Sequence, residues 1–172
     1  TSFGDVLSFT TPIAAPAVTT VAASNITGSA ATLNAAVNPS GALTTVWFRY
    51  ATTSPGTCDD TFGTRSPAAG GSVVGSGNTS VAASQAVSGL PNGTRVYYCA
   101  IAQNSIGTSF GAVLSFVTSA PSVTTLAASA ISGAGATLNA SGNPNGAATT
   151  GWFRYSATNP GTCNDTFGTR AP

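Results

Sequence analysis

Few side chains in this sequence are suited to chemistry. There is no His and no Glu, and the acidic residues are Asp5, Asp59, Asp60 and Asp165. General acid–base catalysis usually needs a His or a carboxyl group with a shifted pKa. Asp59 and Asp60 are adjacent, so their carboxylates cannot readily face each other across a substrate as a hydrolase pair does. No base lies close in sequence to any of the many Ser and Thr residues. We therefore expect no enzymatic activity and no cofactor.

Asp59 and Asp60 are also weak candidates for a calcium site, because Ca²⁺ binds carboxylate and carbonyl oxygens. The alternative is a polar turn in which an Asp side chain accepts hydrogen bonds from backbone amides. With two carboxylates in the segment, the turn is the favoured interpretation. The sequence offers no His and no second Cys nearby, so we expect no other metal site.

The sequence contains an internal repeat. Thr1–Phe9 returns as Thr108–Phe116 with one difference, and Asn25–Pro67 returns as Ala130–Pro172 with 29 of 43 positions identical. The offsets of 107 and 105 residues are too long for a solenoid repeat and suit a whole small domain. We expect three parts: the last strand of a preceding repeat at residues 1–12, a complete repeat at 13–119, and the first half of the next repeat at 120–172.

The two partial repeats cannot complete each other. Both lack a counterpart of Ala68–Gly107, so exchange of a single strand between two chains would leave the domain incomplete. The sequence also contains no Met. We therefore expect the polypeptide to continue at both ends.

The composition predicts an all-β fold and excludes some partners. Strong helix formers are scarce, while β-branched and turn-forming residues are plentiful. The net charge of +1 offers no basic surface for nucleic acid, and no apolar run approaches the ~18 residues of a membrane span. Charged residues make up only 5% of the chain. Either the source has a biased composition, or neighbouring copies cover much of the surface in a fibre, sheath or layer.

Alternating apolar and polar residues predict short strands separated by turns. In Ala31–Val37, for example, Leu33 and Val37 share one face while Thr32 and Asn34 lie on the other. The predicted strands are Ala17–Ala23, Ala31–Val37, Thr44–Tyr50, Ser80–Val87, Arg95–Gln103 and Gly111–Val117. About seven strands in a repeat of this size is typical of an immunoglobulin-like β-sandwich.

Two segments carry a family resemblance. ATLNAAVNPSGALTTVWFRYATT and VSGLPNGTRVYYCAIAQNSIGTSFGAVLSFVT resemble the fibronectin type III-like repeats of bacterial secreted and cell-surface proteins. The resemblance implies tandem immunoglobulin-like β-sandwiches, which serve as spacers, stalks or binding units. Val96 stands where the family usually has a corner tyrosine, so the usual bond from that hydroxyl to the backbone is not expected.

The resemblance also implies a disulfide between Cys58 and Cys99, because the strand before Cys58 and the strand carrying Cys99 are neighbours in this fold. A free structural thiol and an intermolecular bridge are the alternatives. Cys163 corresponds to Cys58, so its partner is expected near position 204, beyond the chain end. A disulfide requires an oxidising compartment, and we therefore expect an extracellular or cell-surface location.

A possible interaction face follows from side-chain alternation on the same two strands. The residues predicted to point away from the core are Trp47, Arg49, Tyr97 and Ile101, and the second repeat carries Trp152 and Arg154 at the positions of Trp47 and Arg49. Three interpretations of this stripe are open. The loop after Cys58, with Phe62, could cover it; a neighbouring domain or fibre strand could contact it; or the Trp could stack on a sugar ring.

Together these observations predict a non-catalytic structural protein. Near-identical domains would stack into a stalk, fibre or sheath at the cell surface, with neighbouring copies of the same repeat as partners. The alternative is an adhesive or carbohydrate-binding module that recognises surface glycans and is appended to a secreted hydrolase.

Overall fold

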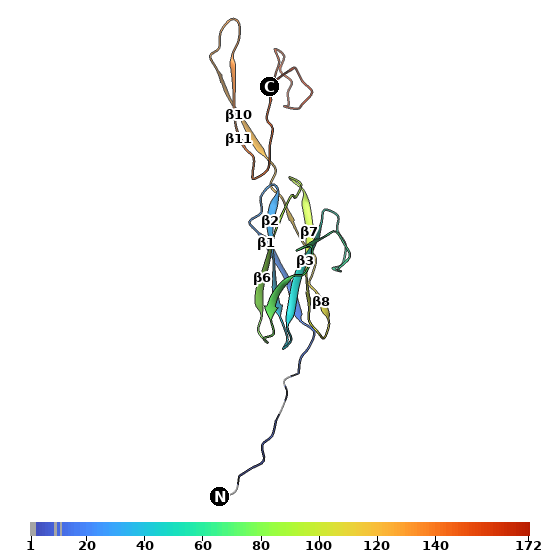
Figure 1. Cartoon of the computed structure of the whole chain (residues 1–172). Helices are drawn as coiled ribbons and strands as arrows, with labels where there is room; N and C mark the ends of the chain where they lie inside the picture. The colour runs from blue at the N-terminus through green and yellow to red at the C-terminus, as the bar shows by residue number, and fades with distance from the viewer. Residues whose placement is uncertain (1–2, 9, 11) are drawn as a thin grey trace. The chain divides into compact units, whose positions relative to one another are not determined.

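The computed structural model describes residues 3–8, 10 and 12–172 (Figure 1). Every regular element in these residues is a β-strand, which confirms the predicted all-β class. The chain divides into two compact units, Thr1–Ser119 and Ala120–Pro172, called unit 1 and unit 2 below. No helix in the described part of the chain is long and apolar enough to cross a membrane.

The described residues of unit 1 form two antiparallel sheets. The smaller sheet has the order β1-β2-β6, and the larger has the order β4-β3-β7-β8, with β5 also paired to β3 and β9 to β7. The strands are β1 (Ala17–Ser24), β2 (Ala30–Asn38), β3 (Thr44–Ala51), β4 (Thr64–Ser66), β5 (Ser72–Gly75), β6 (Val81–Ser88), β7 (Arg95–Gln103), β8 (Thr108–Phe110) and β9 (Leu114–Val117). The long strands β3 and β7 therefore lie at the centre of the larger sheet.

The hydrophobic core of unit 1 combines side chains from both sheets. Alternate residues of β2 are buried, as the sequence pattern predicts for a strand with one face on a core. The larger sheet contributes the residues of β3 and β7 that alternate with those predicted to point away from the core. The core residues are Ala31, Leu33, Ala35, Val37, Val46, Phe48, Ala83, Val87, Leu90, Val96, Tyr98, Ala100, Ala102 and Phe116.

Tyr98 links the core to the smaller sheet. Its ring meets the ring of Phe116 edge-on, with centroids 5.8 Å apart. Its hydroxyl donates a hydrogen bond to the backbone oxygen of Val21 in β1, at 2.7 Å. Burial of a tyrosine is tolerated when the hydroxyl has such a partner. No tyrosine hydroxyl bond was expected at the corner position, because Val96 occupies it. Tyr98, two residues further along β7, makes a hydroxyl-to-backbone bond instead.

The strand predicted at Gly111–Val117 is shorter in the structure, where β9 begins at Leu114. A short strand that was not predicted, β8, ends at Phe110. Between them, the backbone N–H of Gly111 donates to the Ala100 oxygen at 2.9 Å. A Cβ on Gly111 would lie 2.4 Å from the Thr20 hydroxyl oxygen, so the chain passes closer to β1 than another residue would allow. The chain makes this close approach in residues 111–113, which lie between the two strands.

The N-terminal segment 1–12 was predicted to be the last strand of a preceding repeat. Residues 1, 2, 9 and 11 of this segment lie outside the described residues, and residues 3–8, 10 and 12 are not in a strand. A last strand needs the other strands of its own domain as pairing partners, so the assignment stays a prediction.

Unit 2 repeats the local structure of unit 1. β10 (Ser122–Ser129) pairs with β11 (Thr137–Asn143), and β12 (Phe153–Tyr155) pairs with β13 (Thr169–Ala171). The register is the same in both units: Ala17 pairs with Asn38 in β1 and β2, and Ser122 pairs with Asn143 in β10 and β11. The sequence repeat therefore folds into the same hairpins in both places.

Candidate functional site

A disulfide fastens the loop between β3 and β4 to the larger sheet. Cys58 in this loop is bonded to Cys99 in β7, with Cα atoms 6.0 Å apart and a sequence separation of 41. This confirms the pairing that the family resemblance implied. The loop returns to the sheet through Gly63, which has a φ of 50°. A Cβ there would lie 2.2 Å from the Tyr50 oxygen, so the loop needs glycine at this point.

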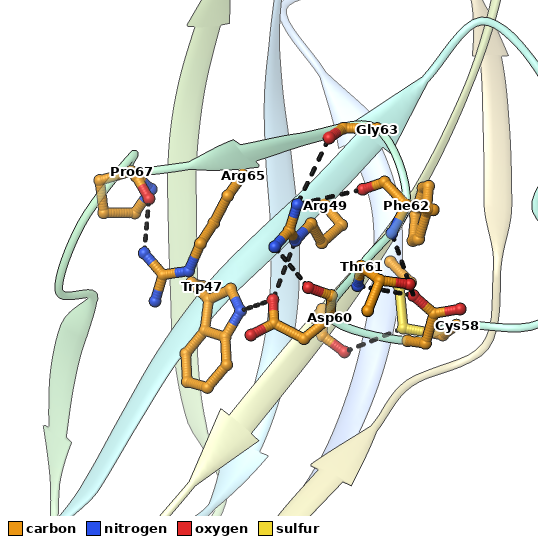
Figure 2. A network of polar contacts seen from close by, with 12 residues as sticks. Trp47, Arg49, Cys58, Asp60, Thr61, Phe62, Gly63, Arg65 and Pro67 are labelled. Carbon is orange, nitrogen blue, oxygen red and sulfur yellow. Dashed lines mark hydrogen bonds and ion pairs between the residues drawn. A yellow bond between two sulfur atoms is a disulfide. The ribbon is translucent and has the colours of Figure 1, made fainter.

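Asp60 is the centre of a polar network on the outer face of β3 (Figure 2). One of its carboxylate oxygens accepts a hydrogen bond from Trp47 Nε1 at 2.8 Å and another from Arg49 Nε at 2.9 Å. Arg49 also donates to the backbone oxygens of Asp60, Phe62 and Gly63. The guanidinium group thus donates hydrogen bonds to three backbone oxygens of the loop as well as to the carboxylate.

Arg65 in β4 completes the network from the other side of the Trp47 ring. Its guanidinium carbon lies 4.6 Å from the ring centroid, within the range of a cation–π contact. The same side chain donates to the backbone oxygens of Pro67, at 2.7 Å, and Gly70. The group formed by Trp47, Arg49, Asp60 and Arg65 is called the Trp–Arg–Asp clamp below. It joins β3, the Cys58 loop and the chain after β4.

Asp59 closes a tight turn at the tip of the loop. One carboxylate oxygen accepts hydrogen bonds from the Thr61 amide at 2.6 Å, the Thr61 hydroxyl at 2.7 Å and the Phe62 amide at 3.0 Å. This is the polar turn that was favoured over a calcium site. Asp60 is paired with Arg49, and no group of three or more His, Cys, Asp or Glu side chains gathers anywhere in the described residues.

The contacts of the two carboxyl groups lower their pKa values. Partial burial raises the pKa of Asp60, but the hydrogen bonds from Arg49 and Trp47 outweigh it, so the pKa lies below its ordinary value. The hydrogen bonds from Thr61 and Phe62 lower the pKa of Asp59. Both groups are therefore negatively charged at neutral pH. At Asp60 this charge balances that of Arg49.

The predicted stripe is covered in unit 1. Trp47 is 5% exposed and Ile101 is fully buried, and together with Cys99 they form a second apolar cluster. Arg49 and Tyr97 are half-buried. Cys58 and Phe62 from the loop, together with Val113, pack against this cluster. The disulfide holds the loop over Trp47 and Ile101, so neither residue is open to solvent in unit 1. Cover by the Cys58 loop is the interpretation that agrees with this burial.

Unit 2 builds the same clamp. Trp152 Nε1 donates to Asp165 at 2.8 Å, and Arg154 Nε donates to the same oxygen at 3.1 Å. The Arg170 guanidinium lies 4.4 Å from the Trp152 ring centroid. The bonds from Trp152 and Arg154 lower the pKa of Asp165. Yet the Trp152 side chain is 41% exposed, and Cys163 is an exposed free cysteine.

Sequence reasoning missed the roles of Asp60 and Arg65. Asp60 was considered as a calcium ligand, and Arg65 was not singled out. A comparison of the two copies of the repeat would have indicated that Asp59 and Asp60 have different roles. Asp59 is replaced by Asn164, whose side-chain oxygen caps the same turn, whereas Asp60 is retained as Asp165. A neutral oxygen caps a turn as well as a charged one does, whereas a carboxylate makes a stronger, charge-assisted hydrogen bond to an arginine.

These contacts define an all-β protein in which a disulfide-anchored loop covers a tryptophan and an arginine. No family model matches the chain, and the curated proteins contain no similar sequence. Among solved structures, it is similar to the sensor domain of the anti-sigma factor RsgI4 of Pseudobacteroides cellulosolvens. A short version shares 14% identity at a TM-score of 0.40 and covers 60% of this chain and 94% of that one. A long version shares 15% identity at a TM-score of 0.38 and covers 60% and 89%.

Proposed function

We propose that this chain is a non-catalytic extracellular structural protein built from tandem immunoglobulin-like sandwiches of the fibronectin type III type. Its near-identical domains would stack into a stalk, fibre or sheath at a cell surface. The observation that carries this proposal is the construction of the same Trp–Arg–Asp clamp twice in one chain, at a spacing of 105 residues. A clamp that ties a loop to a sheet resists deformation, and its repetition suits a protein that bears load along its length.

Two further observations support this role. The disulfide in unit 1 closes a long loop and limits how far that unit can extend, and it requires an oxidising compartment. The 5% charged residues leave little repulsion between identical surfaces, so copies can pack side by side.

High-resolution imaging of the native material tests the proposal. We expect continuous density with a domain-sized repeat and with copies in contact with their neighbours. Separate domains with no regular spacing would overturn the structural role.

An adhesive or carbohydrate-binding module is the alternative function. In unit 1, Trp47 is too buried to stack on a sugar. In unit 2, Trp152 is 41% exposed, although the Arg170 guanidinium lies against its ring. Binding of the full chain to a glycan array, lost in Trp152→Ala and kept in Trp47→Phe, would favour this alternative.

A further inference from the structure

Asn92 and Gly93 form the tip of the turn between β6 and β7 in unit 1. Both residues are exposed, and Gly93 has a φ of 58°. Glycine has no side chain, so the backbone nitrogen after Asn92 is not shielded by a Cβ. The turn therefore places an electrophilic side-chain carbonyl carbon next to a backbone nitrogen that can attack it.

Other contacts do not hold these two groups in place. Among the described residues, the side-chain amide of Asn92 makes no hydrogen bond and the N–H of Gly93 has no acceptor. Asn92 takes part through its backbone oxygen, which accepts a hydrogen bond from the Thr94 hydroxyl at 2.9 Å. Rotation of the Asn92 side chain toward the Gly93 nitrogen therefore breaks no hydrogen bond.

Asn104, in the turn between β7 and β8, has the opposite environment. Its side-chain oxygen accepts hydrogen bonds from two backbone amides, and its side-chain nitrogen donates to two backbone oxygens. The partners are Ile106 N at 2.9 Å, Gly107 N at 3.2 Å, Ala14 O at 2.7 Å and Pro39 O at 3.1 Å. These bonds must break before the Asn104 side chain can reach the nitrogen of Ser105. The fold thus holds Asn104 and leaves Asn92 free to react.

We propose that Asn92 is a site of spontaneous deamidation through a cyclic imide with Gly93. Hydroxide removes the proton of the Gly93 nitrogen, which then attacks the side-chain carbonyl carbon of Asn92. A new carbon–nitrogen bond forms, the bond to the side-chain nitrogen breaks, and ammonia leaves with a proton from water. Because the attacking and attacked groups belong to neighbouring residues, the step is intramolecular and needs no enzyme.

Water completes the modification by opening the imide at either of its two carbonyl carbons. One opening gives aspartate on a normal backbone. The other gives isoaspartate, in which the main chain runs through the side-chain carbon. In total one water is consumed and one ammonia is released, and no electrons are transferred. This modification goes beyond the proposed structural role and does not depend on it.

Thr118 gives the modification a structural consequence, because it ties the two sides of the turn together. Its side chain is buried; its hydroxyl donates to the Pro91 oxygen at 2.6 Å and accepts from the Thr94 amide at 2.9 Å. Isoaspartate lengthens the main chain between Pro91 and Thr94 by one carbon, so the turn no longer matches both bonds. A buried polar group that loses its partner is costly. Isoaspartate at position 92 should therefore destabilise unit 1.

Incubation of the full chain at mildly alkaline pH tests the proposal. Peptide mapping by mass spectrometry follows each asparagine with time, and electron-based fragmentation distinguishes isoaspartate from aspartate. We expect Asn92 to convert to a mixture of the two, at a rate that rises with pH because the attacking nitrogen must be deprotonated. No conversion at Asn92, or a product without isoaspartate, would overturn the proposal.

Ser105→Gly is the matched control, because it gives Asn104 the glycine neighbour that Asn92 has. In the folded variant, Asn104 should react at least about tenfold more slowly than Asn92, since a single hydrogen bond is worth about a factor of five and four must break. Unfolding in urea should remove this difference. Equal rates in the folded chain would contradict selection of Asn92 by the fold.

Asn92→Asp separates the new charge from the altered backbone, because it carries the charge on a normal main chain. Its urea midpoint should match that of the parent, whereas the isoaspartate form, isolated by chromatography, should unfold at lower urea. Equal midpoints would refute the role of Thr118.

A glycan on Asn92 is the competing modification, since Asn92-Gly93-Thr94 also has the spacing of an N-glycosylation acceptor. Mass spectrometry of the native material decides between the two. A sugar on Asn92 would block imide formation and overturn the proposal, while isoaspartate there would support it. Neither result depends on whether the native material forms a fibre, which imaging decides separately.

Discussion

Removal of the Cys58–Cys99 disulfide is expected to destabilise unit 1 by about 4 kcal/mol. The bond closes a loop with a sequence separation of 41, and the chain-entropy model assigns about 4 kcal/mol to a loop of that length. Cys99 is fully buried, so alanine there adds a small cavity and a further cost of up to about 1 kcal/mol. Domains of this size are stable by only about 5–15 kcal/mol. The Cys58→Ala/Cys99→Ala variant should therefore lose between about a third and nearly all of its stability.

Urea unfolding followed by tryptophan fluorescence measures this loss. A Trp152→Phe background leaves Trp47 as the only tryptophan, which reports on the covered cluster beside the disulfide. The midpoint should fall, and the dependence of the free energy of unfolding on urea should steepen, since an unlinked unfolded chain exposes more surface. Chemical reduction of the parent should reproduce the loss, while Cys163→Ala should not.

A loss below about 1 kcal/mol would refute this reasoning, because chain entropy alone predicts several times as much. It would mean that the contacts of Asp60 with Trp47 and Arg49 hold the loop over the sheet without the covalent bond.

Three further predictions concern the clamp and its loop. Asp60→Asn should destabilise unit 1 by about 1–3 kcal/mol in the same urea assay, because it removes the charged partner of a half-buried arginine; Asp59→Asn, which matches the natural residue of the second repeat, should be nearly neutral. The pKa of Asp60 lies below its ordinary value, so the contribution of Asp60 to the free energy of unfolding should be complete above about pH 4 and should disappear as the pH falls through that lower pKa. The NMR shift of the Asp60 carboxyl group would follow its titration, and Asp60→Asn should reduce the acid dependence of stability. Gly63→Ala should cost about 1–3 kcal/mol, since Gly63 has a φ of 50° and a Cβ would meet the Tyr50 oxygen, whereas Gly77→Ala, with open space around it, should stay within about 0.5 kcal/mol. Equal effects for the members of either pair would contradict the assigned contacts.

Much of the fold could be predicted from the sequence, because short-range patterns report it directly. The alternation in β2 identified which of its residues are buried, and in β3 and β7 the residues that alternate with Trp47 and Tyr97, such as Phe48 and Tyr98, are in the core. The repeat of Asn25–Pro67 as Ala130–Pro172 predicted two copies of the same hairpin, and their registers agree. The strands β4 and β5 were missed, since segments of three and four residues are too short to show a periodic pattern.

The candidate site was predictable only in part. Trp47, Arg49 and Asp60 were singled out from the sequence, whereas Arg65 was not, and the pairing of Cys58 with Cys99 followed from the family resemblance. The role of Asp60 could not be read in this way, because a loop has no periodicity to show which neighbour a side chain meets. A comparison of Asp59 with Asn164 and of Asp60 with Asp165 would have indicated it.

The sequence by itself determined the longer strands, their inward faces and the repetition of the β1–β2 hairpin as β10–β11, since each depends on residues that are close along the chain or on identity between two segments. Only the tertiary structure decided what lies over the outer face of β3. Alternation places Trp47 opposite Phe48 but does not say whether solvent or protein meets it. The Cys58 loop covers Trp47 because a disulfide to β7 and an ion pair to Arg49 hold it there. The disulfide joins residues 41 positions apart and the ion pair joins residues 11 apart, and the alternation within a single strand carries no information on either contact.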